Sequence, residues 1–428
     1  MAKDRTQSLH ELLTVVREEI YKCIRCGECR TVCPVFRENP AERYTARGKM
    51  IIAEALATGQ LEMNAHVREA LDNCLLCTGC ASRCSSGARA DRVIAATRRA
   101  FAKELGIPAL KKCISLALQQ PNALLALGAG MGSKMQPLLF KQIPRTSGLW
   151  RRFAMPVLDK DQFIPQLAPT PFRRRASSER GSKGNVIFFT GCMTNYAMTN
   201  IADSLMAVFT ALDIGVAVPK RQACCGTPMM ACGDVDALEK QARRNVAALA
   251  GQDKVVVACS SCGHMLKHGY LDALRHATDL RGPLEDLAAR TMDVSEYLVR
   301  EVGMERLRAI VQHPSGQRVT YHDPCHLKKA QNIVEEPRQL VQLATSGGLT
   351  EMEQPDACCG MGGTYFLGQM DISRKIQQRK TEDVLRTGAS LMATACPGCI
   401  MHLQDGLRRA HHADVQVRHV IQLLAESL

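Results

Sequence analysis

The sequence predicts a multidomain protein of mixed α+β and α/β class, in which an N-terminal α-helical domain precedes a pseudo-twofold pair of α/β domains. Three observations support this prediction. Apolar residues before position 110 recur with helical spacing, a Pro- and Arg-rich stretch follows, and the second half of the chain repeats itself. With 428 residues the chain can form several hydrophobic cores. We expect the boundaries 1–110, 111–184, 185–312 and 313–428.

The first domain is predicted to consist of helices separated by two runs rich in cysteine. Apolar residues three and four positions apart give each segment one hydrophobic face. We expect helices at 8–21, 46–58, 65–73 and 90–105.

The stretch 111–184 is predicted to be a basic, flexible linker. It holds 13 Lys and Arg against three acidic residues, a local charge of +10, and it ends in the sequence PFRRRASSERGSKG. Such a segment can attract an anionic membrane face or an acidic partner. Aromatic residues for base stacking are not interleaved with the charges, so we do not expect binding to nucleic acid.

The second half of the chain contains two copies of one pattern, in which a short apolar strand leads to a cysteine and then to a helix. The strand and cysteine read NVIFFTGC in the first copy and RVTYHDPC in the second. Each copy continues with ACCG and then with a C-x2-C pair, at offsets of 133, 134 and 137 residues between the copies. Strands alternating with helices predict an α/β fold for each copy.

Twenty cysteines point to a disulfide framework or to metal binding. Disulfide frameworks belong to small secreted chains, and the first 20 residues carry four acidic side chains instead of a signal peptide's apolar core. No run of 18 apolar residues is present to span a membrane. We therefore expect a cytoplasmic protein with metal-binding thiolates, and attachment to the inner face of the cytoplasmic membrane stays open.

The N-terminal cysteine runs share the spacing C-x2-C-x2-C-x3-C, which is typical of [4Fe–4S] cubanes. Zinc is the alternative, but tetrahedral zinc usually takes two separated pairs of ligands. The fourth cysteine of a run ligates the other cluster in two-cluster ferredoxins. The spacing thus predicts two clusters with crossed ligation. One is held by Cys23, Cys26, Cys29 and Cys84, and the other by Cys74, Cys77, Cys80 and Cys33.

Each C-terminal copy offers five cysteines, one more than a cubane needs, and adjacent cysteines do not easily bridge each other. The first set is Cys192, Cys224, Cys225, Cys259 and Cys262, and the second is Cys325, Cys358, Cys359, Cys396 and Cys399. This repeat resembles the CCG domain of heterodisulfide reductases. The resemblance implies one or two further [4Fe–4S] clusters of a non-cubane type.

The order of the whole chain resembles the iron–sulfur subunit of glycolate oxidase and of related D-lactate dehydrogenases. The stretches RYTARGKMII, CCGMGGTYFLG and DPCHLKKAQ carry this resemblance. The D subunit of heterodisulfide reductases shares the same order. The resemblance implies a hetero-oligomer in which FAD lies in a separate oxidase subunit and electrons pass to a quinone or another electron-carrier acceptor.

The sequence contains no G-x-G-x-x-G motif for a flavin or a nicotinamide. We therefore predict an electron-transfer subunit whose partner oxidises glycolate or D-lactate, and we assign no catalytic residue here. The alternative is a catalytic subunit that performs thiol–disulfide chemistry at the CCG clusters. A maturation or scaffold protein with structural cysteines is a third interpretation.

Several residues outside these patterns are expected to have ordinary structural roles. Cys113 and Cys232 are predicted to be buried as small apolar residues. His264 and His268 are predicted to lie on a solvent-facing helix. For His322 and His326, hydrogen bonding to a cluster and simple packing at a strand end remain equally open.

Overall fold

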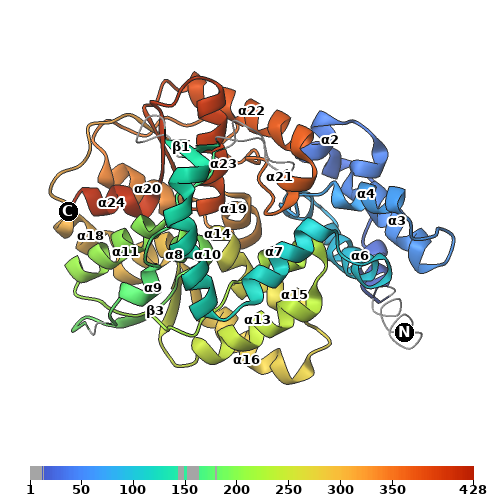
Figure 1. Cartoon of the computed structure of the whole chain (residues 1–428). Coiled ribbons are helices and arrows are strands. Elements are labelled where there is room, and N and C mark those ends of the chain that lie inside the picture. The colour runs from blue at the N-terminus through green and yellow to red at the C-terminus, as the bar shows by residue number, and fades with distance from the viewer. Residues whose placement is uncertain (1–11, 13, 143–148, 152–162, 179–180) are drawn as a thin grey trace.

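The computed structural model describes residues 12, 14–142, 149–151, 163–178 and 181–428. The helical N-terminal part lies to one side of the two C-terminal copies (Figure 1). Parts of the predicted helix 8–21 and of the predicted linker 111–184 lie outside the described residues.

The N-terminal part is helical, as predicted. Its two longest helices, α3 (Ala46–Ala57) and α6 (Ala90–Leu105), pack against each other through a small core. The Thr45 hydroxyl accepts a hydrogen bond from the amide of Gly48 and so caps α3. The remaining elements are η1 (Glu28–Arg30), α2 (Pro34–Glu38), η2 (Glu42–Tyr44), α4 (Ala65–Asp72) and α5 (Gly79–Ser82).

The first C-terminal copy has a parallel four-stranded sheet in the order β4-β3-β5-β6. Its strands are β3 (Asn185–Phe189), β4 (Gly215–Ala217), β5 (Lys254–Val257) and β6 (Thr291–Asp293). Helices cover both faces, so β3 and β5 are nearly continuous runs of buried Val, Ile and Phe. The helical elements are α10 (Gly191–Tyr196), α11 (Thr199–Ala211), α12 (Thr227–Cys232), α13 (Val235–Ala248), α14 (Ser260–His264), η3 (Met265–Gly269), α15 (Tyr270–Ala273), η4 (Thr278–Leu280), α16 (Arg281–Arg290), α17 (Val294–Tyr297), η5 (Leu298–Val302) and α18 (Met304–Ile310).

The second copy repeats this plan with a parallel sheet in the order β7-β8-β9. The place of β4 is taken by two isolated parallel bridges, Ser315 with Thr345 and Val319 with Leu349. The elements are β7 (Val319–His322), α19 (Cys325–Gln331), α20 (Glu335–Ala344), α21 (Tyr365–Gly368), α22 (Met370–Arg386), β8 (Leu391–Thr394), α23 (Pro397–Arg409), β9 (Gln416–His419) and α24 (Val420–Glu426).

The two copies pack as a pseudo-twofold pair. Helix α11 of the first copy packs against α24 of the second. Their pseudo-twofold equivalents, α20 of the second copy and α17 of the first, also pack against each other. The pairs α14 with α19 and α10 with α23 are related in the same manner. One continuous hydrophobic core runs through both copies. The predicted fold class is therefore confirmed.

The segment between the two halves contains more regular structure than a flexible joint would. Helices α7 (Ala109–Gln119) and α8 (Asn122–Leu139), the antiparallel strands β1 (Phe140–Gln142) and β2 (Leu149–Arg151), and α9 (Phe172–Arg175) lie within it. Lys111 forms an ion pair with Asp72 of the N-terminal part at 3.2 Å, and Lys112 forms one with Asp234 of the first copy at 3.2 Å. Helix α7 therefore connects the two halves through charged contacts.

Candidate metal centres

The first N-terminal set of cysteines comes together as the spacing predicts. Cys23, Cys26, Cys29 and Cys84 line one small cavity, and Cys80 reaches its wall. The backbone turns through the left-handed region at Arg25 and Gly27, on either side of Cys26. These turns aim successive thiols into one space.

The second set lines a separate cavity, which contains Cys33, Cys74, Cys77 and Cys80. Leu76 and Thr78 have positive φ at the positions equivalent to Arg25 and Gly27, so both runs have the same backbone shape. The Cys33 thiol accepts a hydrogen bond from the amide of Phe36 at 3.5 Å. Both cavities therefore gather the four thiols that crossed ligation requires.

The second C-terminal set lies where β7, β8 and a long loop meet. Cys325 starts α19, and Cys396 and Cys399 lie at the start of α23. The thiols of Cys359 and Cys399 are 3.5 Å apart, and the amide of Gly360 donates to the thiol of Cys358 at 3.4 Å. All five thiols of this set lie close together.

The first C-terminal set has the same plan. The thiols of Cys192 and Cys224 are 4.0 Å apart, and the Cys225 thiol contacts those of Cys224 and Cys262. Cys259 contacts Cys262. The Gly that follows each cysteine pair is left-handed, with φ of 86° at Gly226 and 94° at Gly360, a conformation that costs other residues free energy.

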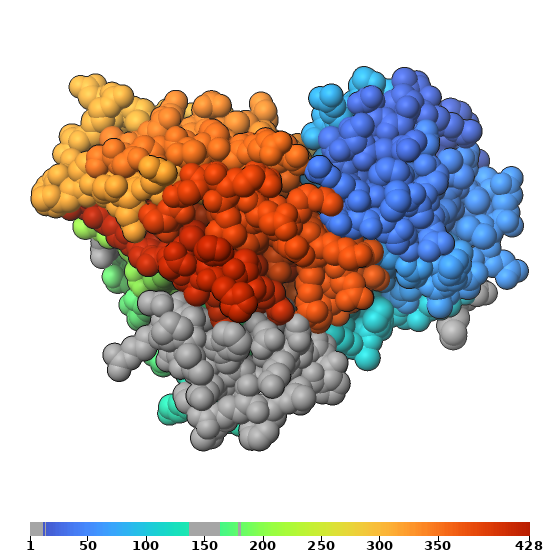
Figure 2. All heavy atoms as spheres, turned by 90° about the horizontal axis from the view of Figure 1, so that it is seen from above, coloured from blue at the N-terminus to red at the C-terminus, as the bar shows by residue number. Residues whose placement is uncertain are grey.

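The sets are arranged in series. Cys77 of the N-terminal part lies close enough to Cys358 for their charges to interact. On the other side of the second C-terminal set, Cys396 lies close enough to its pseudo-twofold equivalent Cys259 of the first set for their thiols to interact, and the neighbouring amide of Ser260 donates to the carbonyl of Ala395 at 3.2 Å. The thiols thus lead from the N-terminal part to the second copy and then to the first. In Figure 2 the N-terminal part lies directly beside the second copy, and α2 packs there against α22.

The chemistry of these sites suits a thiolate-bound metal. All of these cysteines are free of disulfides. Burial raises the pKa of Cys77 to about 12, whereas hydrogen bonding with Cys224 holds the pKa of Cys225 well below its usual range. Several buried thiolates held together repel one another unless a cation neutralises them. The donor sets therefore fit iron–sulfur clusters, which the thiolates would hold.

Two lysines beside the thiols, the buried Lys49 and the half-buried Lys329, were not found by sequence reasoning. Lys49 is 2% exposed, contacts the carbonyl of Tyr44 and lies near Cys74 and Cys33. Lys329 donates to the carbonyl of Asp356 at 2.8 Å, and the nearby thiol of Cys77 raises its pKa against the effect of burial. The sequence marked these lysines only through the stretches that contain them. Lys49 lies in RYTARGKMII and Lys329 in DPCHLKKAQ, which both carry the family resemblance.

Arg98 of α6 was also missed, although it connects the N-terminal part to the first copy. Its buried guanidinium donates to the carbonyls of Leu71, Asp72 and Cys74 at 2.8, 3.1 and 2.7 Å. It also donates to the carbonyl of Ala231 in α12 at 3.1 Å. An arginine on a helix gives no sequence signal for such contacts.

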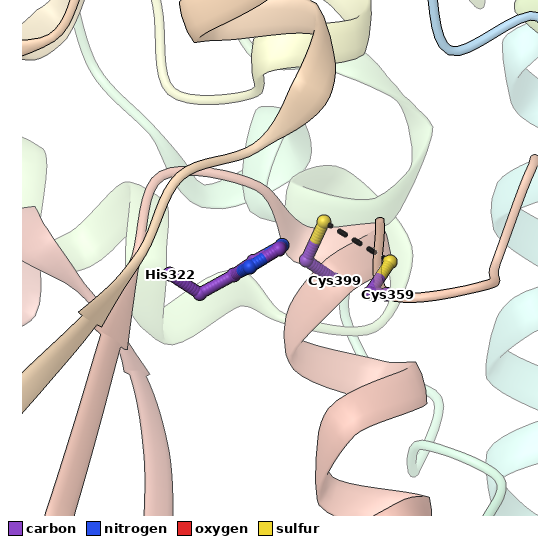
Figure 3. Close-up of side chains that lie close together, drawn as sticks. All are labelled: His322, Cys359 and Cys399. Atoms are coloured by element: carbon purple, nitrogen blue, oxygen red, sulfur yellow. Dashed lines mark hydrogen bonds between the residues drawn. The ribbon is translucent and has the colours of Figure 1, made fainter. Parts of the chain in front are cut away.

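The structure corrects two of the minor expectations. His264 is buried rather than solvent-facing, because its ring stacks on His326 with centroids 4.8 Å apart. His326 in turn contacts Leu76 and Ser261 at 2.9 and 3.0 Å. Cys113 is exposed on α7, whereas Cys232 is buried as expected. His322 lies beside Cys359 and Cys399 (Figure 3).

Two larger cavities border the centres. One of about 450 Å³ reaches both Cys33 and Cys358. Its lining combines basic with acidic residues, namely Arg37, Lys329, Arg379, Lys380 and Arg386 with Glu353, Asp356 and Asp383. The other, of about 290 Å³, is mostly apolar, lies between α6 and α15, and reaches Leu76, Thr78 and His264.

Fold and site together define an iron–sulfur protein with an N-terminal two-cluster domain and a pair of cysteine-rich domains. Residues 19–88 match the 4Fe-4S dicluster domain, and residues 186–267 and 319–404 each match the cysteine-rich domain named CCG. The resemblance predicted from the motifs is therefore confirmed.

Three relatives are similar over nearly the whole chain. The probable glycolate oxidase iron-sulfur subunit of Bacillus subtilis is 28% identical, with 96% of this chain and 94% of the relative covered. The B subunit of the fumarate reductase (CoM/CoB) of Methanothermobacter marburgensis is 29% identical over 94% of this chain and 71% of its own. The D subunit of the dihydromethanophenazine:CoB–CoM heterodisulfide reductase of Methanosarcina barkeri is 25% identical, with 100% and 99% covered.

Proposed function

We propose that this chain is the electron-transfer subunit of a flavin-dependent 2-hydroxy-acid dehydrogenase, with glycolate or D-lactate as the substrate of the complex. The observation that carries the proposal is the series of thiols from the N-terminal part through Cys77 and Cys358 to the contact between Cys396 and Cys259. Two cubanes and two CCG clusters bound along this series would form a continuous path for electrons.

The residues of the chain would tune and insulate this path. Iron–sulfur clusters supply one-electron redox chemistry when they are bound. Lys49 and Lys329 place positive charge beside the thiolates and so favour added electrons, because charges near a cluster set its potential. The C-terminal sets, in which all but Cys192, Cys259 and Cys325 are buried, would limit the access of water to bound clusters.

The proposal assigns substrate oxidation to an FAD-linked partner subunit in a hetero-oligomer. The B. subtilis relative supports this assignment, because it is named as a subunit of glycolate oxidase and aligns over almost its full length. A quinone is the proposed acceptor. The mostly apolar cavity of about 290 Å³ beside Leu76 and His264 supports it, since ligand sites combine apolar walls with a few polar groups.

The test is a purified complex assayed with both hydroxy acids, using quinone and an artificial dye as alternative acceptors. Changing Cys225 or Cys359 to Ser should remove the iron of that copy alone. It should also stop quinone reduction, while the flavin subunit still reduces the dye. A complex that still reduces quinone after both changes would end the proposal.

A second candidate function is thiol–disulfide reduction at a CCG cluster. The cavity of about 450 Å³ favours it, because Arg37, Lys329 and Arg379 could bind a small anionic disulfide next to Cys358. The fumarate reductase and heterodisulfide reductase relatives also agree with it. Reduction of a carboxylated disulfide by the chemically reduced chain, lost in Lys329→Met and kept in Lys328→Met, would establish this function instead.

We also propose that the chain attaches to the inner face of the cytoplasmic membrane through α8. Leu124, Leu127, Met131 and Met135 form an apolar stripe on this helix, and each is at least 50% exposed. Lys134 is an exposed cation of the same helix, one turn after Met131, and Arg174 and Lys220 line a cavity beside Ala123 near the start of α8. Apolar area next to positive charge suits an anionic lipid surface. Within the described residues, no helix is both long and apolar enough to cross a membrane.

Vesicle flotation tests this attachment. Binding to anionic vesicles should weaken at high salt and disappear in the double variant Leu127→Glu/Met131→Glu. Leu105→Glu, which changes an exposed leucine of α6, serves as the matched control. Equal binding to zwitterionic and anionic vesicles would argue against a contribution from the cations, and no binding at low salt would argue against a lipid contact.

A further inference from the structure

His322 ends strand β7 and points into the second C-terminal set of cysteines (Figure 3). It is 1% exposed. Both of its ring nitrogens lack a hydrogen-bond partner among the described residues. Buried polar atoms rarely remain unsatisfied, and each such atom in a native protein calls for an explanation. The imidazole therefore calls for a partner other than the described side chains and backbone.

The position of the ring indicates what that partner is. Ligand atoms of His322, Cys359 and Cys399 all lie within 4.8 Å of one another, and the two thiols are 3.5 Å apart. Three soft or borderline donors at this separation can reach a single metal ion. Imidazole is a common ligand of iron and replaces thiolate in some iron–sulfur centres.

The first copy has no such group. Strand β3 ends at Phe189, three residues before Cys192, just as β7 ends at His322, three residues before Cys325. Phe189 is buried, and both its ring and the thiol of Cys262 lie within 4 Å of the Cβ position at Gly191. An apolar ring thus occupies in the first copy the place that an imidazole occupies in the second.

We propose that His322 ligates an iron of the second C-terminal centre, the iron that Cys359 and Cys399 also hold. This proposal rests on the proposed function only in assuming that the second set holds a cluster. It makes the two pseudo-symmetric centres chemically different, with a nitrogen ligand in the second and sulfur ligands alone in the first. The second C-terminal centre, which lies nearer the N-terminal clusters, would then differ from the first in the ligands of one iron.

The test is pulsed EPR on protein labelled with ¹⁵N-histidine, with the second centre in a paramagnetic state. A directly bound nitrogen gives a strong hyperfine coupling, which should be present in the wild type and absent from His322→Phe, the residue of the first copy. His419→Asn removes another buried histidine, at the end of β9, and should leave the coupling unchanged. His322→Cys should keep the iron of the second set and lose the nitrogen coupling, which covers the case that His322→Phe fails to assemble.

Three results would overturn the proposal. They are a nitrogen coupling of only hydrogen-bond strength, a strong coupling that persists in His322→Phe, and a second set that takes up no iron. None of them depends on quinone reduction. Failure of the electron-transfer function would instead appear as lost quinone reduction with an intact nitrogen coupling.

Discussion

Replacing Arg98 by Met should loosen the N-terminal part from the first C-terminal copy. Methionine has similar length and needs no hydrogen bond, so the change removes the donors without opening a large cavity. The carbonyls of Leu71, Asp72, Cys74 and Ala231 would lose the guanidinium, which bonds to them at 2.7 to 3.1 Å.

The size of the effect follows from these contacts. A hydrogen bond to a charged group contributes about 1.5 to 3 kcal/mol, and leaving a buried acceptor unpaired costs about 1 to 3 kcal/mol. The four contacts are not additive, and water can reach some of the carbonyls. We therefore expect Arg98→Met to lower the free energy of unfolding by about 3 to 5 kcal/mol. The shifted Cys74 loop should also lower the iron content of the second N-terminal set.

The assay is urea unfolding of anaerobic protein followed by circular dichroism, together with iron per chain. Lys103→Met on the exposed side of α6 is the matched control and should change stability by less than about 0.5 kcal/mol. Arg98→Lys keeps the charge but not the four contacts. Its loss of unfolding free energy should therefore lie between those of Lys103→Met and Arg98→Met. A loss below about 1 kcal/mol in Arg98→Met with full iron content would refute the role given to this arginine.

Three further predictions follow from the geometry. Gly360→Ala should destabilise by about 2 to 4 kcal/mol and reduce iron in the second C-terminal set, because φ is 94° and the new Cβ would lie 2.7 Å from the carbonyl of Ser373. Gly59→Ala, just after α3 with φ of 73° and no atom within 4 Å, should cost only about 1 kcal/mol in the same urea assay; equal losses would contradict the steric explanation. Lys329→Met should lower the reduction potential of the nearby clusters by about 0.1 V in a redox titration, whereas Lys328→Met should not, because one partly buried charge is worth about 2 kcal/mol. Burial lowers the pKa of His419 to about 4, below its unfolded value, so the unfolded chain binds more protons and stability falls as pH drops below about 6.5. Between neutral pH and pH 5 this loss is about 2 kcal/mol, and His419→Asn should be free of it while retaining a side chain that can cap α24; identical pH profiles would show that His419 does not titrate on unfolding.

Much of the fold could be predicted because its signals are local. Helical spacing indicated α3, α4 and α6, and apolar runs before cysteines indicated β3, β5, β7 and β8. The cysteine spacing, the repeat and the CCG resemblance predicted four sets of thiols, and thiols of each predicted set lie near one another in the structure. Helices α7 and α8 were missed because Pro, Gly and Gln obscured their helical pattern in a stretch that resembled a linker.

The sequence by itself determined the two cysteine runs and the duplicated α/β copies, because these depend on residues close together in the chain or on a repeat. The membership of each thiol set stays a prediction from the sequence. Only the tertiary structure decided the order of the sets. It places Cys77 beside the second copy rather than the first, and brings Cys259 against Cys396 across the pseudo-twofold axis. It also decided the burial of Lys49 and His322. Such contacts arise from complementary surfaces that meet only after each part has folded, and no spacing along the chain encodes them.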